Sequence, residues 1–433
     1  MMGGELLLEE LRKEIKLAIG CTEPAAIALA VAYATAALGA PPHEIKVVLD
    51  PQTYRNALAV GLPYTSLKGP AMSAALGAFL SPQKELLLFA DLDPRDAVKA
   101  EELFRSGRAR AFFDSSLQDL YIEAQVRNNV HRARACIRHY HTNLVALEGP
   151  CLNHHNLKPV NWPEPPKSIW ENTTFTDLFH LASQLDPDKL TFLQEAAKTN
   201  LAIARHGLRK GSGLGTGRGL LHIARQIATA GRHDFNWAGV CLAAQAVACA
   251  AVDARMSGVP LPVATLGGSG NQGITSLLPV WLVAKGLRAG QGRGLQALAL
   301  SAAVTLWAKN KLGRLSRVCG SAFAGSWGIA AASLWLLGSD STPVTRTLCN
   351  LAGSLSGIIC DGAKPSCSLK VMVGVETGLK TALLTLQGLT ASPSGLIAET
   401  VDQTLDNVAS LARVGMGGAD QVLLTLTHPY FGV

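Results

Sequence analysis

The spacing of apolar residues predicts helices at the start of the chain. Within residues 5–19 the apolar positions recur at helical spacing, which is typical of an amphipathic helix. The predicted buried face holds Leu7, Leu11, Ile15 and Ala18. A second helix, rich in alanine and almost free of charge, is expected from Pro24 to about Leu38, because proline suits a first helical turn. Since it has no polar face, it is expected to be buried.

Short apolar and alternating stretches predict strands in the first third of the chain. Residues 44–50 and 85–89 have the composition of single strands. From 118 to 148 apolar and polar positions alternate, and the pattern occurs three times in succession. This range predicts a meander of antiparallel strands. The N-terminal part is therefore expected to be α+β.

A proline-rich stretch at 150–172 is the best candidate for a linker. Beyond it, strand patterns nearly disappear. Helices are expected at 176–207, 219–231, 238–256, 295–312, 322–337, 346–359, 369–388 and 396–414. The predicted fold class is α+β, with an N-terminal α+β domain (1–160) that contains antiparallel strands and a mainly α-helical C-terminal domain (161–433).

Two uncharged stretches make a membrane protein the competing interpretation. The first, Met256–Ala284, is interrupted by glycines and by Pro260, Pro262 and Pro279, and is expected to be a loop between shorter elements. The second, Val318–Ser339, is rich in small residues and resembles a buried helix more than one that faces lipid. We therefore expect a soluble protein that does not bind membranes.

Composition narrows the class of protein further. Of 433 residues, 48% are hydrophobic and only 16% charged, which excludes a disordered chain. Nine cysteines are too few, and odd in number, for a disulfide scaffold. Glu5, Glu9 and Glu10 disfavour a signal peptide, so reduced thiols and a cytoplasmic location are expected. The low charge favours a homo-oligomer, whose interface would cover apolar surface.

Charge is unevenly distributed in the second half of the chain. Between Asp253 and Asp340 there is no acidic residue, while the span carries eight lysines and arginines. It cannot supply carboxylate ligands for Mg²⁺ or Ca²⁺, but it suits an anionic ligand. An ordinary solvated basic surface is the alternative. Nucleic-acid binding is not expected, because no recognition motif accompanies these residues.

Residues 268–273 match the G-x-G-x-x-G pattern of dinucleotide-binding proteins. That site also needs an acidic residue about 20 positions later, and none occurs before Asp340, so this interpretation is rejected. What remains is a glycine-rich loop with two amides, Asn271 and Gln272, whose backbone N–H groups can hold a carboxylate or a phosphate. A tight turn between helices is the alternative.

Cysteine and histidine clusters suggest two kinds of metal site. The cysteines and histidines between 136 and 155 match no structural zinc spacing, although histidines there can still line a pocket. Cys319, Cys360 and Cys367 lie near helix ends and loops, where thiolates are stabilised. Three thiolates can hold three irons of a [4Fe–4S] cluster and leave the fourth iron open. Burial as three small apolar side chains is the alternative.

Cys21 stands at the start of the second predicted helix. The partial positive charge of a helix N-terminus is expected to lower the pKa of this thiol. A thiolate there can act as a base or a nucleophile. Packing in the core is the alternative.

Several segments together resemble the iron–sulfur L-cysteine desulfidases, which are related to the iron–sulfur L-serine dehydratases. They occur in the family's order and extend over most of the chain. The matching segments are residues 20–25 (GCTEPA), 141–143 (HTN), 253–256 (DARM), 268–275 (GSGNQGIT), 313–316 (GRLS) with 319–320 (CG), and 360–365 (CDGAKP) with Cys367.

The resemblance implies a [4Fe–4S] lyase that eliminates the β-substituent of a small amino acid and releases pyruvate and ammonia, with sulfide when the substrate is L-cysteine. It makes Cys319, Cys360 and Cys367 the cluster ligands and Cys21 the base. The implied substrate-binding residues are Thr22, Glu23, Asn56, His141, Ser269, Asn271, Gln272 and Lys364. The alternatives are an L-serine dehydratase, a lyase with pyridoxal phosphate on Lys364, and a non-catalytic amino-acid-binding relative.

Overall fold

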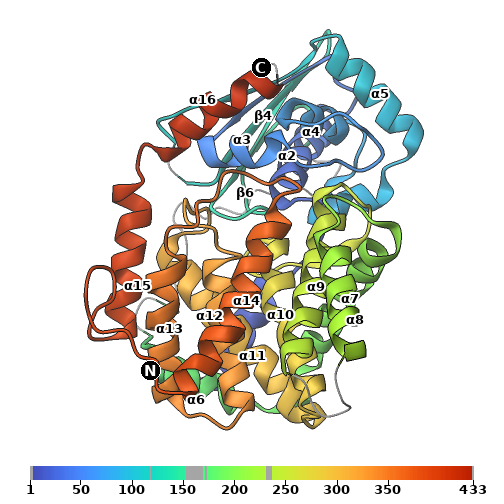
Figure 1. Ribbon diagram of the computed structural model, residues 1–433. Helices are drawn as coiled ribbons and strands as arrows, with labels where there is room; N and C mark the ends of the chain where they lie inside the picture. Colours follow the sequence, from blue (N-terminus) through green and yellow to red (C-terminus); the bar gives the residue numbers. More distant parts are fainter. Residues whose placement is uncertain (1–2, 118, 153–168, 171–172, 231–236, 432–433) are drawn as a thin grey trace.

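The computed structural model describes residues 3–117, 119–152, 169–170, 173–230 and 237–431. It is mixed α+β, with the sheet in the N-terminal part and helices in the C-terminal part (Figure 1). The predicted fold class is confirmed. Most of the predicted linker and the predicted boundary at residue 160 lie outside the described residues.

A five-stranded sheet forms the N-terminal part, in the order β3-β2-β4-β5-β6. The bounds are β2 Glu44–Leu49, β3 Ala109–Phe113, β4 Tyr121–Arg127, β5 Arg132–Arg138 and β6 Leu144–Glu148. The meander β4-β5-β6 is antiparallel as predicted, and β2 joins β4 antiparallel, with Val47 opposite Ala124. The pairing of β2 with β3 is parallel and was not predicted.

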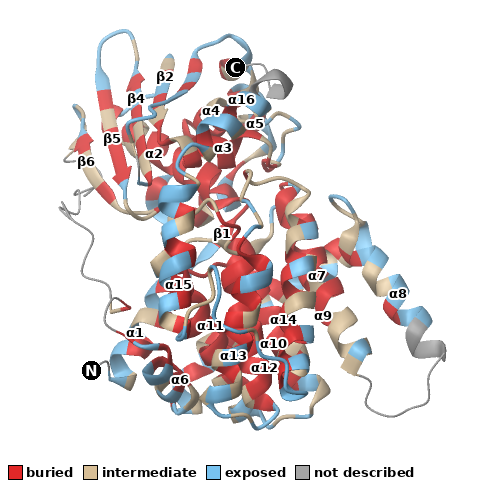
Figure 2. Cartoon of the chain, turned by 60° about the vertical axis from the view of Figure 1, so that its left-hand side comes forward, coloured by how far each residue is buried: buried red, intermediate tan, exposed pale blue. Residues whose placement is uncertain are grey.

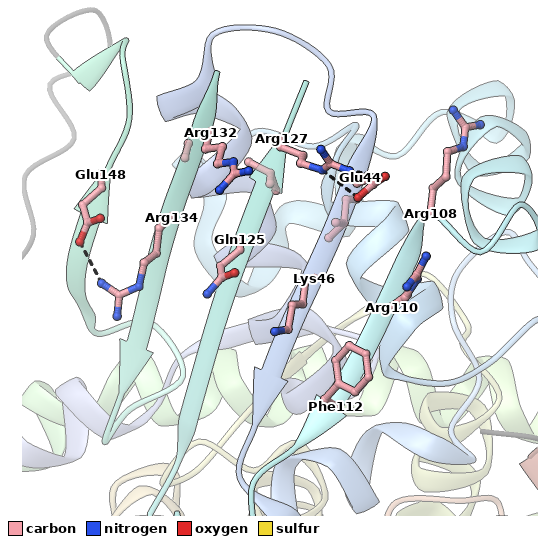
Figure 3. A pocket seen from close by; sticks show the side chains of 13 residues that line it. Glu44, Lys46, Arg108, Arg110, Phe112, Gln125, Arg127, Arg132, Arg134 and Glu148 are labelled. Carbon is pink, nitrogen blue, oxygen red and sulfur yellow. Dashed lines mark hydrogen bonds and ion pairs between the residues drawn. The ribbon is translucent and has the colours of Figure 1, made fainter. Parts of the chain in front are cut away.

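One face of this sheet is buried and the other is open. Alternate residues such as Ile45, Val47 and Ile122 are buried beneath α2 (Thr22–Leu38) and its neighbours. Helix α2 contacts the sheet, α4 and η1, which explains its alanine-rich sequence without a polar face. The open face is polar and mainly basic, and it includes Lys46, Arg110 and Gln125 (Figure 3).

Shorter helices complete the N-terminal part. They are α3 (Pro51–Leu58), α4 (Pro70–Gly77), α5 (Pro94–Arg105) and the 3₁₀ segment η1 (Pro82–Asp91). The predicted strand at 85–89 is therefore wrong. Ser81 caps the segment and Pro82 follows it, so the apolar run begins in a helical turn. A short apolar run cannot be assigned to strand or helix from its periodicity alone.

The first predicted helix ends earlier than expected. Helix α1 spans Gly4–Glu14, and the rest of the predicted helix forms strand β1 (Leu17–Ile19). This strand pairs antiparallel with β7 (Pro262–Ala264), so that Leu17 lies opposite Ala264. The correction comes from pairing with a segment about 245 residues away, which local periodicity cannot show.

The C-terminal part is a bundle of helices around a buried core (Figure 2). The bounds are α6 Phe175–Ser183, α7 Thr191–Lys210, α8 Thr216–Ala230, α9 Trp237–Met256, α10 Gly270–Gly286, α11 Gln291–Leu312, α12 Phe323–Leu336, α13 Ser341–Leu355, α14 Cys367–Leu386, α15 Val401–Ser410 and α16 Ala419–Phe431. Two short helical turns, η3 (Pro187–Leu190) and η4 (Leu411–Gly415), connect neighbours. The predicted helix at 176–207 is thus interrupted between α6 and α7, where Asp186 and Pro187 begin a new turn.

The expectation of a loop between Met256 and Ala284 is wrong for most of its length. Helix α10 begins directly after Ser269 and continues through Pro279. Nearly every residue from Gly270 to Ala284 is buried, so packing on all sides stabilises a helix whose glycines and proline disfavour it locally. The second uncharged stretch forms the buried helix α12, as predicted.

Within the described residues, α9 is the one helix long and apolar enough to cross a membrane by length and composition. It contacts α7, α8, α10 and α14, and its second half, from Ala244 to Met256, is almost entirely buried. The second half of α9 thus lies in the core of the bundle, while its first half is only partly buried.

The first helix of the chain packs in the C-terminal half of the protein, and the last helix packs against the N-terminal half. Leu7, Leu8 and Leu11 of α1 belong to the apolar cluster of the helical part. Conversely, Leu424 of α16 packs with the cluster of the sheet, and α16 lies against α3 (Figure 1). These exchanges fix how the two halves face each other, and the site described below lies between them.

Asp420 of α16 is the charged centre of this contact. It is buried and pairs with Arg55 of α3, while its second oxygen accepts hydrogen bonds from Arg317 Nε (2.8 Å) and Gln52 Nε2 (3.0 Å). Asp420→Ala is expected to lower the free energy of unfolding by about 3–5 kcal/mol, because the buried Arg55 loses its counter-charge.

Urea denaturation measures the effect of Asp420→Ala. Asp406→Ala is the matched control, since Asp406 pairs with Lys311 in a largely exposed position, where such pairs contribute about 0–1 kcal/mol. Equal losses in the two variants would contradict the role given to Asp420.

Candidate active site

A small pocket of about 90 Å³ lies between the sheet part and the helical bundle. It is lined by eleven of the twelve residues that the sequence singled out. They are Cys21, Thr22, Glu23, Asn56, His141, Ser269, Asn271, Gln272, Cys319, Cys360 and Cys367. The twelfth, Lys364, does not line the pocket and pairs with Asp361 beside it.

The N-terminus of α2 supplies one wall. Cys21 is the N-cap residue, and Thr22 and Glu23 form the first turn. The Glu23 carboxylate receives three hydrogen bonds, from Cys21 Sγ and Thr22 Oγ1 at Oε2 and from Asn56 Nδ2 at Oε1, each 3.0 Å long. This network fixes the carboxylate and sets Cys21 as a hydrogen-bond donor to it.

The charge state of Cys21 differs from the sequence-based expectation. Burial, and next the neighbouring Glu23 carboxylate, raise the pKa of the Cys21 thiol well above its ordinary value. The prediction that the helix N-terminus lowers this pKa is wrong, because desolvation outweighs the helix dipole. Burial also raises the pKa of Glu23, but His141, Cys21 and Arg255 together outweigh it and leave the pKa below its usual value. The resting pair is therefore a thiol and a carboxylate.

The N-terminus of α10 supplies the facing wall. Ser269 caps the helix by accepting from the backbone N–H of Gln272. Asn271 accepts a 2.8 Å hydrogen bond from Arg255 Nη1, so it orients a buried guanidinium. A side chain at Gly270 would place its Cβ 2.4 Å from Arg255 Nε, which explains the glycine at this position. The predicted glycine-rich loop is thus the start of a helix that carries an arginine beside it.

Buried polar atoms without a hydrogen-bond partner gather in this pocket. Among the described residues, six such atoms belong to four pocket residues: Asn56 Oδ1, His141 Nδ1 and Nε2, Arg255 Nε and Nη2, and Gln272 Oε1. An unpaired buried polar group costs about 1–3 kcal/mol, so a cluster of them indicates a ligand site. The set combines hydrogen-bond donors, on Arg255, with acceptors, on Asn56 and Gln272.

Three cysteines form the remaining wall. A short antiparallel bridge joins Val318 to Ile359, and in it Cys319 N donates to Ile358 O and Cys360 N to Arg317 O, both at 2.7 Å. Cys367 begins α14 at the end of the following loop. Burial, and then the nearby thiols Cys360 and Cys367, raise the pKa of Cys319 to about 12.

This donor set fits an iron–sulfur cluster. All three thiols are free of disulfides and line the same cavity. No group of three or more His, Cys, Asp or Glu side chains in the described part of the chain is arranged around a single metal ion. A cluster differs from a single ion because each cysteine binds its own iron atom. The alternative of three separately packed apolar side chains does not explain why all three open on one pocket.

His141 is buried next to the carboxylate network, with Nε2 4.0 Å from Glu23 Oε1. Burial, and next Arg314, Lys309 and Arg255, lower its pKa to about 4, against the opposing effect of Glu23. His141 is therefore neutral at pH 7. Because its pKa is lower in the folded state, its contribution to stability is complete above pH 6.5 and decreases as the pH falls towards 4.

Because of this pKa shift, lowering the pH from 7.5 to 5 is expected to decrease the free energy of unfolding of the wild type by about 2 kcal/mol more than that of His141→Gln. Urea denaturation of both proteins at the two pH values measures the difference. Parallel losses in the two proteins would show that His141 is not held neutral by its surroundings.

Three cations in the pocket were not assigned by the sequence analysis: Arg255, Lys309 and Arg314. Lys309 Nζ donates to Arg314 O at 2.8 Å, and burial, followed by Arg314, lowers its pKa to about 8. All three come from the acid-free span, whose excess of positive charge was the available signal. Two other cations of this span, Lys285 and Arg293, lie over tryptophan rings outside the pocket. The positive charge of the span is thus divided between the pocket and positions outside it.

Comparisons with known proteins place the chain among its relatives. Residues 99–425 match the family model described as serine dehydratase alpha chain. A "UPF0597 protein" of Methanocella arvoryzae is 34% identical over 98% of both chains. Proteins of the same name from Desulfotalea psychrophila and Oleidesulfovibrio alaskensis are 33% and 34% identical, over at least 96% of both chains in each case.

Proposed function

The chain belongs to the serine dehydratase alpha chain family, and we propose that it is a [4Fe–4S]-dependent lyase acting on a small α-amino acid. L-cysteine is the proposed substrate, giving pyruvate, ammonia and hydrogen sulfide. L-serine, which the family's description favours, is the second candidate and would give pyruvate and ammonia. A cytoplasmic homo-oligomer with no nucleic-acid or membrane partner is part of the proposal.

The arrangement of unpaired buried atoms carries this proposal. Arg255 offers Nε and Nη2, the two donors on one edge of a guanidinium, which match a carboxylate. Asn56 Oδ1 and Gln272 Oε1 are acceptors, and the Glu23 carboxylate is negative, which together suit an ammonium group. One ligand that satisfies both sets is the zwitterion of an α-amino acid.

A cluster on Cys319, Cys360 and Cys367 would supply an open iron that polarises the departing thiol or hydroxyl as a Lewis acid. The protein's own task is to remove the α-proton. Cys21 donates its proton to Glu23, and the resulting thiolate is the proposed base. As Cα loses its proton to the sulfur, the Cα–Cβ double bond forms and the β-substituent leaves with the bonding electrons. The enamine released then tautomerises to an imine, which water hydrolyses to pyruvate and ammonia.

The proposal is tested by anaerobic purification followed by assays for pyruvate and sulfide with L-cysteine and for pyruvate with L-serine. Iron, acid-labile sulfide and pyridoxal phosphate are measured in the same sample. A pyridoxal phosphate enzyme is disfavoured, because Lys364 pairs with Asp361 and does not line the pocket. A non-catalytic relative would bind the amino acid reversibly and form no pyruvate. Absence of pyruvate from an iron-replete sample with either substrate would overturn the proposal.

The role of Arg255 gives a separate prediction. Arg255→Gln is expected to raise the KM for the amino acid about 10- to 100-fold, because each hydrogen bond to a charged group contributes about 1.5–3 kcal/mol. Arg293→Gln is the matched control, since Arg293 lies over Trp335 outside the pocket. An unchanged KM in Arg255→Gln at normal iron content would remove Arg255 from the binding site.

A further inference from the structure

A second hollow of about 260 Å³ adjoins the catalytic pocket, and we refer to it as the entrance hollow. It is formed by the end of α1, the turn after β5 and the loop after α11. His141, Gly268 and Arg314 line both cavities. Two segments that the sequence analysis singled out, 141–143 and 313–316, contribute to it, although the proposed function assigns no role to most of their residues.

Gly268 lies where the two cavities meet. This residue has φ +75°, and a Cβ there would lie 2.7 Å from His141 Nδ1 and 2.9 Å from Arg314 Nη1. A side chain at Gly268 would therefore press into the groups that separate the hollow from the pocket. Glycine keeps the imidazole and the guanidinium side by side at this boundary.

Arg314 is held firmly at this wall. Its Nη2 lies 2.8 Å from Glu14 Oε1, and its Cζ lies 4.0 Å from the ring centre of Tyr140. Stacking and a paired carboxylate fix the plane of a guanidinium at a small entropic cost. Nη1, on the side of Gly268, makes no hydrogen bond among the described residues. Arg314 therefore presents a fixed donor at the boundary of the two cavities.

The entrance hollow is positively charged. Lys13, Lys16 and Arg314 face it together with a single carboxylate, that of Glu14. The partners of the two lysines, Glu10 at 3.4 Å and Glu85 at 3.5 Å, form loose and partly exposed pairs, which neutralise little. A concave surface of one sign concentrates ions of the opposite sign.

We propose that the entrance hollow is an outer binding site for the α-carboxylate of the incoming amino acid, with Arg314 as the residue that binds it before Arg255 does. This inference rests on the proposed function, since it takes its ligand from that reaction. The hollow, at about 260 Å³, has room for one small amino acid. The competing explanation is that Arg314 only ties α1 to the loop after α11 through Glu14.

Three variants test the outer site in the anaerobically purified enzyme. Arg314→Gln removes the proposed ligand, Lys16→Glu reverses an exposed charge, and Thr142→Trp fills the hollow. Each is expected to lower kcat/KM for L-cysteine about 5- to 20-fold, with kcat changed less than threefold and iron content unchanged. The loss in Lys16→Glu is expected to shrink at high salt, because an exposed charge is screened. The matched controls lie outside the hollow: Lys84→Glu at an exposed position, and Thr199→Trp at a half-buried position like that of Thr142.

A binding measurement without turnover separates this inference from the proposed function. Calorimetric titration of the enzyme with pyruvate, whose carboxylate matches that of the substrate, is expected to show about tenfold weaker binding in Arg314→Gln than in the wild type. If the wild type turns over normally and all three variants keep the wild-type kcat/KM and pyruvate affinity, the outer site is overturned. The proposed function would then remain intact. Loss of iron or a fall in kcat alone in Arg314→Gln would assign Arg314 the structural role. Absence of turnover in the iron-replete wild type would overturn the proposed function itself.

Discussion

Replacement of Cys360 by alanine is expected to remove iron and turnover together. The isolated backbone bridge between Val318 and Ile359 lies directly before Cys319 and Cys360 in the chain, and both thiols line the same pocket. Alanine leaves this bridge intact, because its hydrogen bonds involve only backbone atoms. The variant should therefore fold normally, while the donor set falls to two thiols, which cannot hold a cluster that needs three. Iron and acid-labile sulfide per chain, the visible absorption spectrum and pyruvate formation are the measurements.

Cys349→Ala provides the matched control for this prediction. Cys349 is also a buried free cysteine, but it packs near Thr404 and does not line the pocket. It is expected to keep iron and activity, and to lose only the stability that belongs to a small buried side chain. Normal iron content in Cys360→Ala would refute the assignment of the ligands.

Cys21→Ser is expected to lower kcat at least 100-fold while iron content stays unchanged. The thiol donates to Glu23 over 3.0 Å, so transfer of one proton along an existing hydrogen bond creates the base. A serine hydroxyl keeps the hydrogen bond but is far less acidic, and positioned proton transfer contributes about 10²–10⁴-fold to such reactions. The measurement is kcat together with the spectrum of the cluster.

A second substitution distinguishes chemistry from packing at Cys21. Cys136→Ser changes another buried cysteine, on strand β5 and outside the pocket, and should leave kcat within about twofold of the wild type. Glu23→Gln should lower kcat in the same way as Cys21→Ser, because the amide cannot accept the thiol proton. Full activity in Cys21→Ser would remove Cys21 from the mechanism.

Local sequence signals were sufficient to predict helices and strands whose conformation is determined by the pattern of their own residues. The alternation from Leu120 to Val126 predicted strand β4, and the alanine-rich run after Pro24 predicted α2. The sequence was not sufficient where distant segments decide. Strand β1 exists because it pairs with β7, and α10 persists through Pro279 because neighbouring helices surround it. Propensity is a weak guide where tertiary packing supplies most of the stability.

In the candidate site, too, local sequence signals were sufficient for some features and not for those that depend on tertiary structure. Residue types and their order, read through a family resemblance, located eleven residues that the fold brings to one pocket. Arg255 lies in the matching segment 253–256, but the sequence did not identify it as a site residue. No local signal distinguishes a guanidinium that faces a ligand from one that faces solvent. The pKa of Cys21 was predicted in the wrong direction for a related reason. A helix N-terminus can be inferred from the sequence, but burial and the proximity of Glu23 to the thiol depend on the tertiary structure.

The central claim is that one pocket holds both a three-cysteine iron–sulfur cluster and the zwitterion of a small amino acid. The most direct test is the electron paramagnetic resonance spectrum of the reduced, anaerobically purified protein, recorded before and after addition of L-cysteine or L-serine. The account predicts a [4Fe–4S] signal, with about four irons per chain, that shifts when either amino acid is added and loses this response in Arg255→Gln. A protein reconstituted with iron and sulfide that shows no cluster signal, or a signal that neither amino acid changes, would contradict it.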